Sequence, residues 1–363
     1  MKLGIVGLPN AGKTTLYNAI MQTEAETSNY PFTTTTSNIG RALVPDERLD
    51  KLFEMYKSKV LTPATVEMVD IAGLAKGSSR GEGIGNKFLS FIRESDALVH
   101  VVRCFEDENV IHVYDTVDPV RDIETVDLEL IFSDLEMIER RLVKVQKTAR
   151  TDKSFQREAD VLAKIKDTLE EGKAARTLTW DDADDLKMVE SFTLITQKPV
   201  LYAANVSEDD LTGAPSAPLK ALIDYATSQG ANYYVSCAKM EAEIAMLDPE
   251  EKQMFLDDLG LAESGLDRLI NAGYEMLGLI SFLTAGEKEV RAWTIRRNTK
   301  APAAAGKIHS DLERGFIRAE VVAYDNLIAS GSYNAAKEKG LVGVEGKEYI
   351  VQDGDVVLVR FNV

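Results

Sequence analysis

A short segment near the start of the chain has the residue types and spacing of a phosphate-binding loop. Residues 7–15 read GLPNAGKTT and directly follow the apolar run 3–6. In the pattern G-x-x-x-x-G-K-[ST], the glycines let backbone N–H groups converge on phosphates, the lysine reaches the outer phosphates, and the hydroxyl can ligate Mg²⁺. The strand expected before the loop and the helical run after it supply the context that the motif requires. The triphosphate site is therefore expected to include Asn10, Ala11, Gly12, Lys13, Thr14 and Thr15.

Two later segments carry groups that could complete a magnesium site around Thr14. Residues 30–36 read YPFTTTT, and Thr34 could close the metal shell when the triphosphate is bound, although an exposed threonine-rich loop is the alternative. Asp70 ends a predicted strand and can hold Mg²⁺ through water, while the N–H of Gly73 can reach the γ-phosphate. Thr14, Thr34 and Asp70 are therefore the expected metal-site residues.

Two segments at the ends of later predicted strands stand where a guanine-reading N-K-x-D motif and its partner loop would lie. Residues 205–208 read NVSE, so Val206 replaces the lysine that packs on the base and Glu208 replaces the aspartate that accepts two guanine hydrogen bonds. Losing such a contact removes about 1–3 kcal/mol of discrimination. Adenine instead offers an amino group that Asn205 could accept, so we expect ATP to be preferred over GTP; binding of both is the alternative. The residues expected at the base are Asn205, Val206, Ser236 and Ala238.

The position after Gly73 predicts an unusual hydrolytic centre. A Ras-type enzyme keeps a water-orienting glutamine there, whereas this chain has Leu74, which cannot hydrogen-bond water. His112 follows the third predicted strand of the G-domain and could swing toward the γ-phosphate, which makes it the candidate catalytic residue; a surface histidine is the alternative. Hydrolysis is therefore expected to be slow without a partner.

The apolar segments indicate a parallel α/β sheet interrupted by a helical insertion. Strands are expected at 3–6, 65–71, 97–104, 199–204 and 233–236, with about 95 residues between the third and fourth. Within the insertion, two apolar stripes predict helices that fold back as an antiparallel pair, serving either as packing or as an arm that touches a partner. The first stripe is Leu128, Ile131, Leu135, Ile138, Leu142 and Val145, and the second is Phe155, Leu162, Ile165 and Leu169.

From about residue 281 the pattern changes to short strands, which predicts a separate α+β domain. Between residues 282 and 318 this region has eight cationic and four acidic residues, a local net charge of +4. RNA is the candidate partner, with Trp293 and Phe316 as stacking groups; a core tryptophan and a solvated charged face are the alternatives.

Taken together, these motifs resemble those of the translation-factor-related P-loop GTPases, and their detailed form resembles the Obg-like ATPase (YchF) family over essentially the full chain. The resemblance implies an α/β fold: a P-loop G-domain at 1–118 and 199–279 with a mostly parallel sheet, an antiparallel coiled-coil insert at 119–198, and a C-terminal TGS domain of β-grasp fold at 280–363. It also implies Mg²⁺-dependent ATP hydrolysis and association with the ribosome. The segments that carry it are GLPNAGKTT, NYPFTT, DIAGLAKGSSRGEGIGNKFL, HVVRCF and RAWTIRRNTKAPAAAGKIHSDLERGFIRAEV.

Composition sets outer limits on these interpretations. The 363 residues are 45% hydrophobic and carry a net charge of −17, which disfavours wrapping of DNA. Cys104 and Cys237 are too far apart to suggest a disulfide framework or a zinc site. The chain has neither a leader pattern nor an apolar run of about 18 residues, so we expect a cytoplasmic protein with no membrane partner. A nucleotide-regulated binding module and a metabolic kinase are the rival functions.

Overall fold

A computed structural model describes residues 1–27, 39–71 and 84–362 of the chain. It divides into two compact units, the first formed by residues 1–40 and 67–268 and the second by residues 41–66 and 269–363. Three residues singled out above, Thr34, Gly73 and Leu74, lie outside the described residues. The described helices include none that is both long and apolar enough to cross a membrane.

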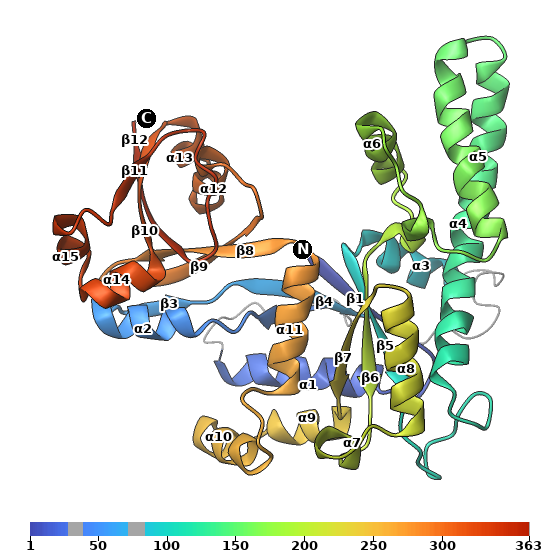
Figure 1. Ribbon diagram of the computed structural model, residues 1–363, viewed down its shortest axis with the longest axis horizontal. Coiled ribbons are helices and arrows are strands. Elements are labelled where there is room, and N and C mark those ends of the chain that lie inside the picture. The colour runs from blue at the N-terminus through green and yellow to red at the C-terminus, as the bar shows by residue number, and fades with distance from the viewer. Residues whose placement is uncertain (28–38, 72–83, 363) are drawn as a thin grey trace. The chain divides into compact units, whose positions relative to one another are not determined.

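The first unit is built on a sheet with the strand order β2-β4-β1-β5-β6-β7 (Figure 1). Its central strands β4, β1, β5, β6 and β7 pair in parallel, which confirms the predicted mostly parallel sheet. Parallel strands place their carboxyl ends at one edge, so the segments that follow them meet there. The strands are β1 (Lys2–Val6), β2 (Ile39–Leu43), β4 (Thr65–Asp70), β5 (Ala97–Arg103), β6 (Val200–Asn205) and β7 (Asn232–Ser236).

Both faces of this sheet are buried. One face shares a core with α3 (Ile84–Glu94), the first part of α4 (Pro119–Ala149) and α8 (Ala217–Ser228). The alternate residues of β1 and β5 are at most 3% exposed, so the other face is covered as well. The remaining helices of the unit are α1 (Lys13–Thr27), α7 (Asp209–Thr212), α9 (Ala238–Ile244), α10 (Pro249–Asp258) and the start of α11 (Gly265–Met276).

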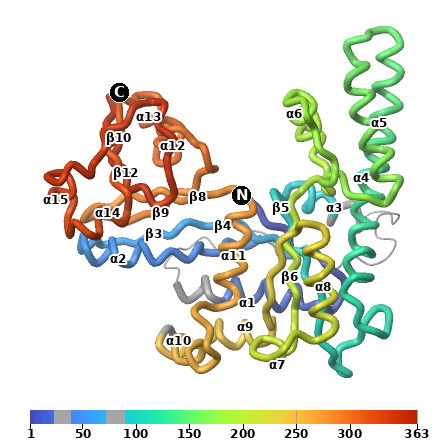
Figure 2. Tube along the Cα trace, viewed as in Figure 1, coloured from blue at the N-terminus to red at the C-terminus, as the bar shows by residue number. Residues whose placement is uncertain are grey.

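The insertion between β5 and β6 is helical, and its main helix changes neighbours along its length. The lower part of α4 buries Ile123, Val126 and Leu130 against the sheet, whereas its upper part packs on α5 (Gln156–Glu170) through residues such as Ile138. The α4–α5 pair and α6 (Ala183–Ser191) can be followed in Figure 2.

Two residues of the predicted stripes are not in this core: Leu128 is 43% exposed and Phe155 is 38% exposed. Leu128 lies near the point at which the buried side of α4 changes from contact with the sheet to contact with α5. Phe155 lies just before the start of α5.

A buried carboxylate fastens the insertion to the sheet unit. Asp134 of α4 is fully buried, and its oxygens accept hydrogen bonds from the backbone N–H groups of Ile195 and Thr196 just before β6. The Arg93 guanidinium at the end of α3 lies 2.9 Å from the same carboxylate. Because a buried charge is costly unless it is paired and hydrogen-bonded, these contacts fix the base of the helical insertion.

The second unit has a mixed sheet with the order β11-β10-β12-β8-β9-β3. Residues 41–66, expected in the G-domain, join this unit because β3 pairs in parallel with β9, from Val60 opposite Glu289 to Thr62 opposite Arg291. The strands are β3 (Val60–Thr62), β8 (Leu279–Ala285), β9 (Glu289–Arg296), β10 (Phe316–Ala323), β11 (Gly343–Glu345) and β12 (Asp355–Phe361). The helices are α2 (Glu47–Tyr56), α12 (Ala301–Ile308), α13 (Ser310–Arg314), α14 (Tyr324–Ser330) and α15 (Tyr333–Glu338).

The two aromatic residues expected to stack on RNA belong instead to the core of this second unit. Phe316 is 5% exposed, and Trp293 stacks on Phe282 with ring centroids 6.4 Å apart. The Trp293 Nε1 donates to the Thr284 hydroxyl at 2.9 Å. Phe316 is thus a core residue and Trp293, partly buried, packs against the same core, as in the alternative of a core tryptophan.

Candidate functional site

The phosphate loop connects β1 to α1 and depends on close backbone packing. Gly7 and Gly12 have φ angles of +149° and +100°, which side chains rarely adopt. A Cβ atom on Gly7 would lie 2.3 Å from the Val101 carbonyl oxygen, and one on Gly12 would lie 2.2 Å from the Asn205 amide nitrogen. The two glycines are therefore needed for close approach to neighbouring strands as well as for phosphate access.

Lys13 is folded into this loop. Its side chain is buried, and Nζ donates a hydrogen bond of 2.7 Å to the Leu8 carbonyl oxygen. Burial lowers the pKa of Lys13 to about 8, and the nearby Asp70 carboxylate partly opposes this shift. The ammonium group thus has one carbonyl partner in this conformation, and phosphate oxygens would be far stronger acceptors.

Thr14 and Asp70 meet as a magnesium site requires. The Thr14 Oγ1 lies 3.1 Å from Asp70 Oδ2, while Asp70 Oδ1 is buried with no hydrogen-bond partner in the described part of the chain. An orphaned carboxylate oxygen beside a loop hydroxyl fits a divalent cation bound by hydroxyl, water and phosphate oxygens. The described residues form no cluster of three or more histidine, cysteine, aspartate or glutamate side chains that could hold a metal by themselves.

Asn205 joins the phosphate loop to the segment after β7. Its Nδ2 donates to the Ala11 carbonyl oxygen at 3.0 Å, and its Oδ1 accepts from the Ala238 N–H at 2.9 Å. The side chain is buried, and Val206 and Ser236 beside it are buried and bonded through their backbones at 2.9 Å. In this structure the Asn205 amide oxygen is thus engaged by the Ala238 N–H, and both residues line the cavity described below, so their contact with a base stays a prediction.

Two charged residues that follow the ends of β6 and β7, Glu208 and Lys239, pair with each other. Their side chains form an ion pair of 3.2 Å and are 53% and 74% exposed. The pairing raises the pKa of Lys239, through its hydrogen bond to Glu208. Sequence reasoning identified Glu208 only as a misplaced guanine acceptor and did not pair it with Lys239.

Arg103 holds the loop that follows β5, which forms one wall of the cavity described below. This residue was not singled out from the sequence. The arginine is 3% exposed and donates to the carbonyl oxygens of Phe105, Asp107 and Val110 at 2.8–3.2 Å. Its guanidinium also lies 4.6 Å from the centroid of the Phe105 ring. The available signal was an arginine ending an otherwise apolar strand, where a buried cation needs several carbonyl partners.

These walls enclose one cavity at the carboxyl edge of the sheet. It has a volume of about 660 Å³, within the range of small-molecule sites. The lining comes from the phosphate loop with the start of α1, from the loop that Arg103 holds, and from the ends of β6 and β7. The lining residues are Asn10, Gly12 to Thr15, 105–107, Val110, 205–209 and 237–239.

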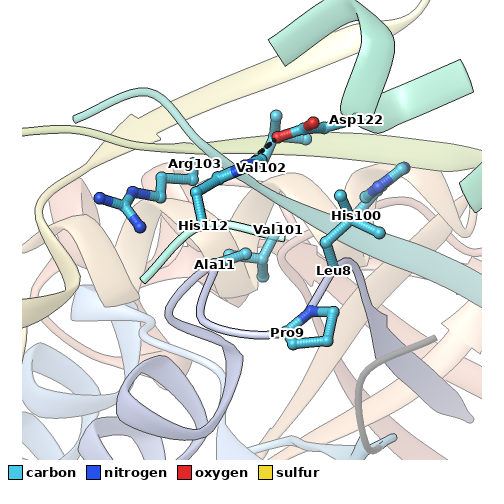
Figure 3. A pocket seen from close by; sticks show the side chains of 9 residues that line it. All are labelled: Leu8, Pro9, Ala11, His100, Val101, Val102, Arg103, His112 and Asp122. Atoms are coloured by element: carbon cyan, nitrogen blue, oxygen red, sulfur yellow. Dashed lines mark hydrogen bonds and ion pairs between the residues drawn. The ribbon is translucent and has the colours of Figure 1, made fainter. Parts of the chain in front are cut away.

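His112 lies elsewhere. It is 8% exposed, its Nε2 is 2.8 Å from Asp122 Oδ2, and its Nδ1 accepts from the Tyr114 N–H at 3.1 Å. Figure 3 shows the His112 and Asp122 side chains directed toward one another behind phosphate-loop residues such as Ala11. Both ring nitrogens are occupied, so His112 is neither a surface histidine nor, in this conformation, a group facing the cavity.

Comparisons with known proteins agree with the fold and identify the family. A family model described as "50S ribosome-binding GTPase" matches residues 2–134, and the model YchF-GTPase_C, described as "Protein of unknown function (DUF933)", matches residues 279–362. The chain is 54% identical over 362 residues to the ribosome-binding ATPase YchF of Bacillus subtilis (strain 168), with 99% of each chain covered. It is 42% identical over 367 residues to Obg-like ATPase 1 of Oryza sativa subsp. japonica, with 100% of this chain and 92% of the relative covered.

A solved structure is similar over the same extent. The structure of the Schizosaccharomyces pombe YchF GTPase matches with a TM-score of 0.89 and 37% sequence identity, covering 99% of this chain and 97% of the other. The predicted α/β fold class is therefore confirmed, together with the resemblance on which it partly rested. The chain belongs to the YchF family of Obg-like ATPases.

Proposed function

We propose that this chain is a Mg²⁺-dependent ATPase that prefers ATP over GTP and associates with the ribosome in a nucleotide-dependent manner. The observation that carries the proposal is the cavity lined by Lys13, Thr14, Glu208 and Lys239, with the Asp70 carboxylate 3.1 Å from the Thr14 hydroxyl. The names of the relatives, which describe ribosome-binding ATPases, support the choice of substrate and partner.

In this proposal each part of the phosphate loop has one task. Backbone N–H groups of residues 10–15 and the Lys13 ammonium hold the phosphates, Thr14 ligates the metal directly, and Asp70 supports it through water. Thr34 and Gly73 remain proposed partners of the metal and the γ-phosphate. When bound, Mg²⁺ neutralises charge on the transferring phosphoryl group.

The state of Glu208 argues against a preference for GTP, and the choice of ATP rests on the names of the relatives. Guanine presents two donors that need a free carboxylate, whereas the Glu208 carboxylate is engaged by Lys239 and Val206 offers no lysine stem. We expect calorimetry to show ATP binding about tenfold or more tighter than GTP, because a bidentate base contact is worth about 1–3 kcal/mol.

The matched variant for this measurement is Lys239→Gln, which frees the Glu208 carboxylate at an exposed position. This variant should bind GTP more tightly, so the difference between the ATP and GTP affinities should become smaller. Equal or tighter GTP binding by the unmodified protein would show that the base preference is wrong.

Nucleotide binding is expected to take up a proton at alkaline pH. The pKa of Lys13 is about 8 in the structure, and triphosphate oxygens would raise it, so roughly half a proton should be taken up on binding at pH 8. Below about pH 6.5 Lys13 is already charged, so the proton uptake on nucleotide binding should vanish. Well above pH 8 the affinity for nucleotide should fall about tenfold per pH unit, because Lys13 must first be protonated.

Calorimetry of MgATP binding in two buffers of different ionisation enthalpy measures this uptake. Lys13→Arg is the control, because arginine stays charged throughout this range. The same proton uptake in wild type and Lys13→Arg would contradict the assignment to Lys13.

His112 remains a proposed water-orienting residue that must first leave Asp122. His112→Ala should therefore slow single-turnover ATP hydrolysis while leaving ATP affinity nearly unchanged. Asp122→Asn weakens the hydrogen bond that holds the His112 ring but keeps the imidazole itself. Hydrolysis by this variant should therefore be at least as fast as by the wild-type protein. If both substitutions slow hydrolysis equally, His112 only positions the loop between β5 and α4.

Contact between the C-terminal domain and RNA stays part of the proposal in a changed form. Trp293 and Phe316 are core residues, so such contact would rest on exposed cations such as Arg296, Arg297 and Arg318 and not on stacking.

A further inference from the structure

The turn that joins α4 to α5 is strongly basic in an acidic chain. Residues 140–157 contain seven lysines and arginines and one acidic residue, a local charge of +6. The remainder of the chain carries −23, which is the total of −17 less this +6. We propose that this turn is an RNA-binding surface that contacts the phosphate backbone, an inference that rests on the ribosome association proposed above.

Three of the seven cations are already paired with carboxylates of this chain and are not counted as phosphate-binding groups. Arg140, Arg141 and Arg157 pair with carboxylates, as in the 2.7 Å contact between Arg141 and Glu158. The other four are exposed and have no ion pair with any described residue. We call these four the tip surface: Lys144, Lys147, Arg150 and Lys153.

The helix geometry turns these cations outward. Leu142 and Val145 are buried against α5, and Lys144 and Lys147, three residues apart, share the opposite face of α4. Arg150 caps the end of α4 and Lys153 lies in the turn. The single acidic residue, Asp152, is engaged as a helix cap, since its carboxylate accepts from the Ser154 N–H at 2.9 Å. The tip surface is therefore a group of four cations with one carboxylate, that of Asp152, in the same turn.

The tip surface lies far from the phosphate loop, at the other end of the helix pair. Helix α4 has 31 residues and is therefore about 46 Å long. Figure 1 shows the α4–α5 turn at the far end of this pair from the sheet. Near its other end, Asp122 bonds His112, which follows Ile111, whose carbonyl accepts from the phosphate-loop residue Asn10 at 3.0 Å.

RNA fits this surface better than an acidic protein does. Phosphate contacts need spaced cations and tolerate water between them, whereas a stable protein interface needs a dehydrated apolar core. The only large apolar side chains exposed among the described residues 140–157 are Val143 and Phe155, too few for an interface of about 800 Å² per partner. Because the chain as a whole is acidic, a polyanion is directed to its basic regions, of which this turn, at +6, is more basic than residues 282–318, at +4.

The experiment compares the full chain with two matched fourfold variants. The tip variant carries Lys144→Gln, Lys147→Gln, Arg150→Gln and Lys153→Gln. The control carries Lys51→Gln, Lys220→Gln, Lys339→Gln and Lys347→Gln, which are exposed lysines elsewhere, so both variants have the same net charge. Basal ATP hydrolysis should be unchanged in both and serves as the check on folding.

Binding is measured to purified ribosomes and to an RNA duplex of about 20 base pairs over a series of salt concentrations. The tip variant should bind both at least about tenfold more weakly, with a salt slope shallower by about 3, because about four phosphate contacts are lost. The control should bind both like wild type.

Each other outcome has a distinct meaning. If wild type binds ribosomes and both variants bind them equally well, the tip inference is overturned while the proposed function stands. If wild type binds no ribosomes, the proposed function itself fails. If the tip variant loses ribosome binding but wild type ignores the duplex and is displaced by an acidic peptide, the partner is a protein and the RNA assignment is wrong.

Discussion

The site depends on one buried amide. Asn205 at the end of β6 donates to the Ala11 carbonyl in the phosphate loop and accepts from the Ala238 N–H at the start of α9. A buried side-chain amide must satisfy its donor and its acceptor, and here each partner belongs to a different wall of the nucleotide cavity. Gly12 is required because any Cβ at that position would overlap the Asn205 amide. Asn205 therefore ties the phosphate loop directly to the segment after β7.

This arrangement assigns different tasks to neighbouring residues. Asn205 and Ala238 hydrogen-bond to each other, while Glu208, Lys239 and the loop that Arg103 holds line the same cavity. Lys13 and Asp70 both retain unused capacity: burial lowers the pKa of Lys13, and one Asp70 oxygen has no partner among the described residues. Groups left under-satisfied in the protein alone are the ones that a metal–triphosphate would satisfy.

The sequence predicted the parts of this protein that follow local rules. The phosphate loop, the parallel strands and the helical insertion all have short-range signals: motif spacing, apolar runs and a periodic stripe. It did not predict that residues 41–66 join the second unit, because the β3–β9 pairing links segments more than 200 residues apart and leaves no local pattern. Leu128 shows a related limit, since periodicity marks an apolar position but not the point at which a helix changes neighbours.

The functional residues divide in the same way. Thr14 and Asp70 were predicted from their motifs and lie together, whereas the tasks of Asn205 and His112 depend on partners, Ala238 and Asp122, that only the fold brings near. The most direct test of the account measures ATP and GTP affinities of Asn205→Ala, with Ser207→Ala as the control. We expect both affinities to fall by a similar factor of about ten or more, because two buried hydrogen bonds that position the walls are lost. A loss confined to ATP, with GTP binding unchanged, would mean that Asn205 reads the base and would contradict the account.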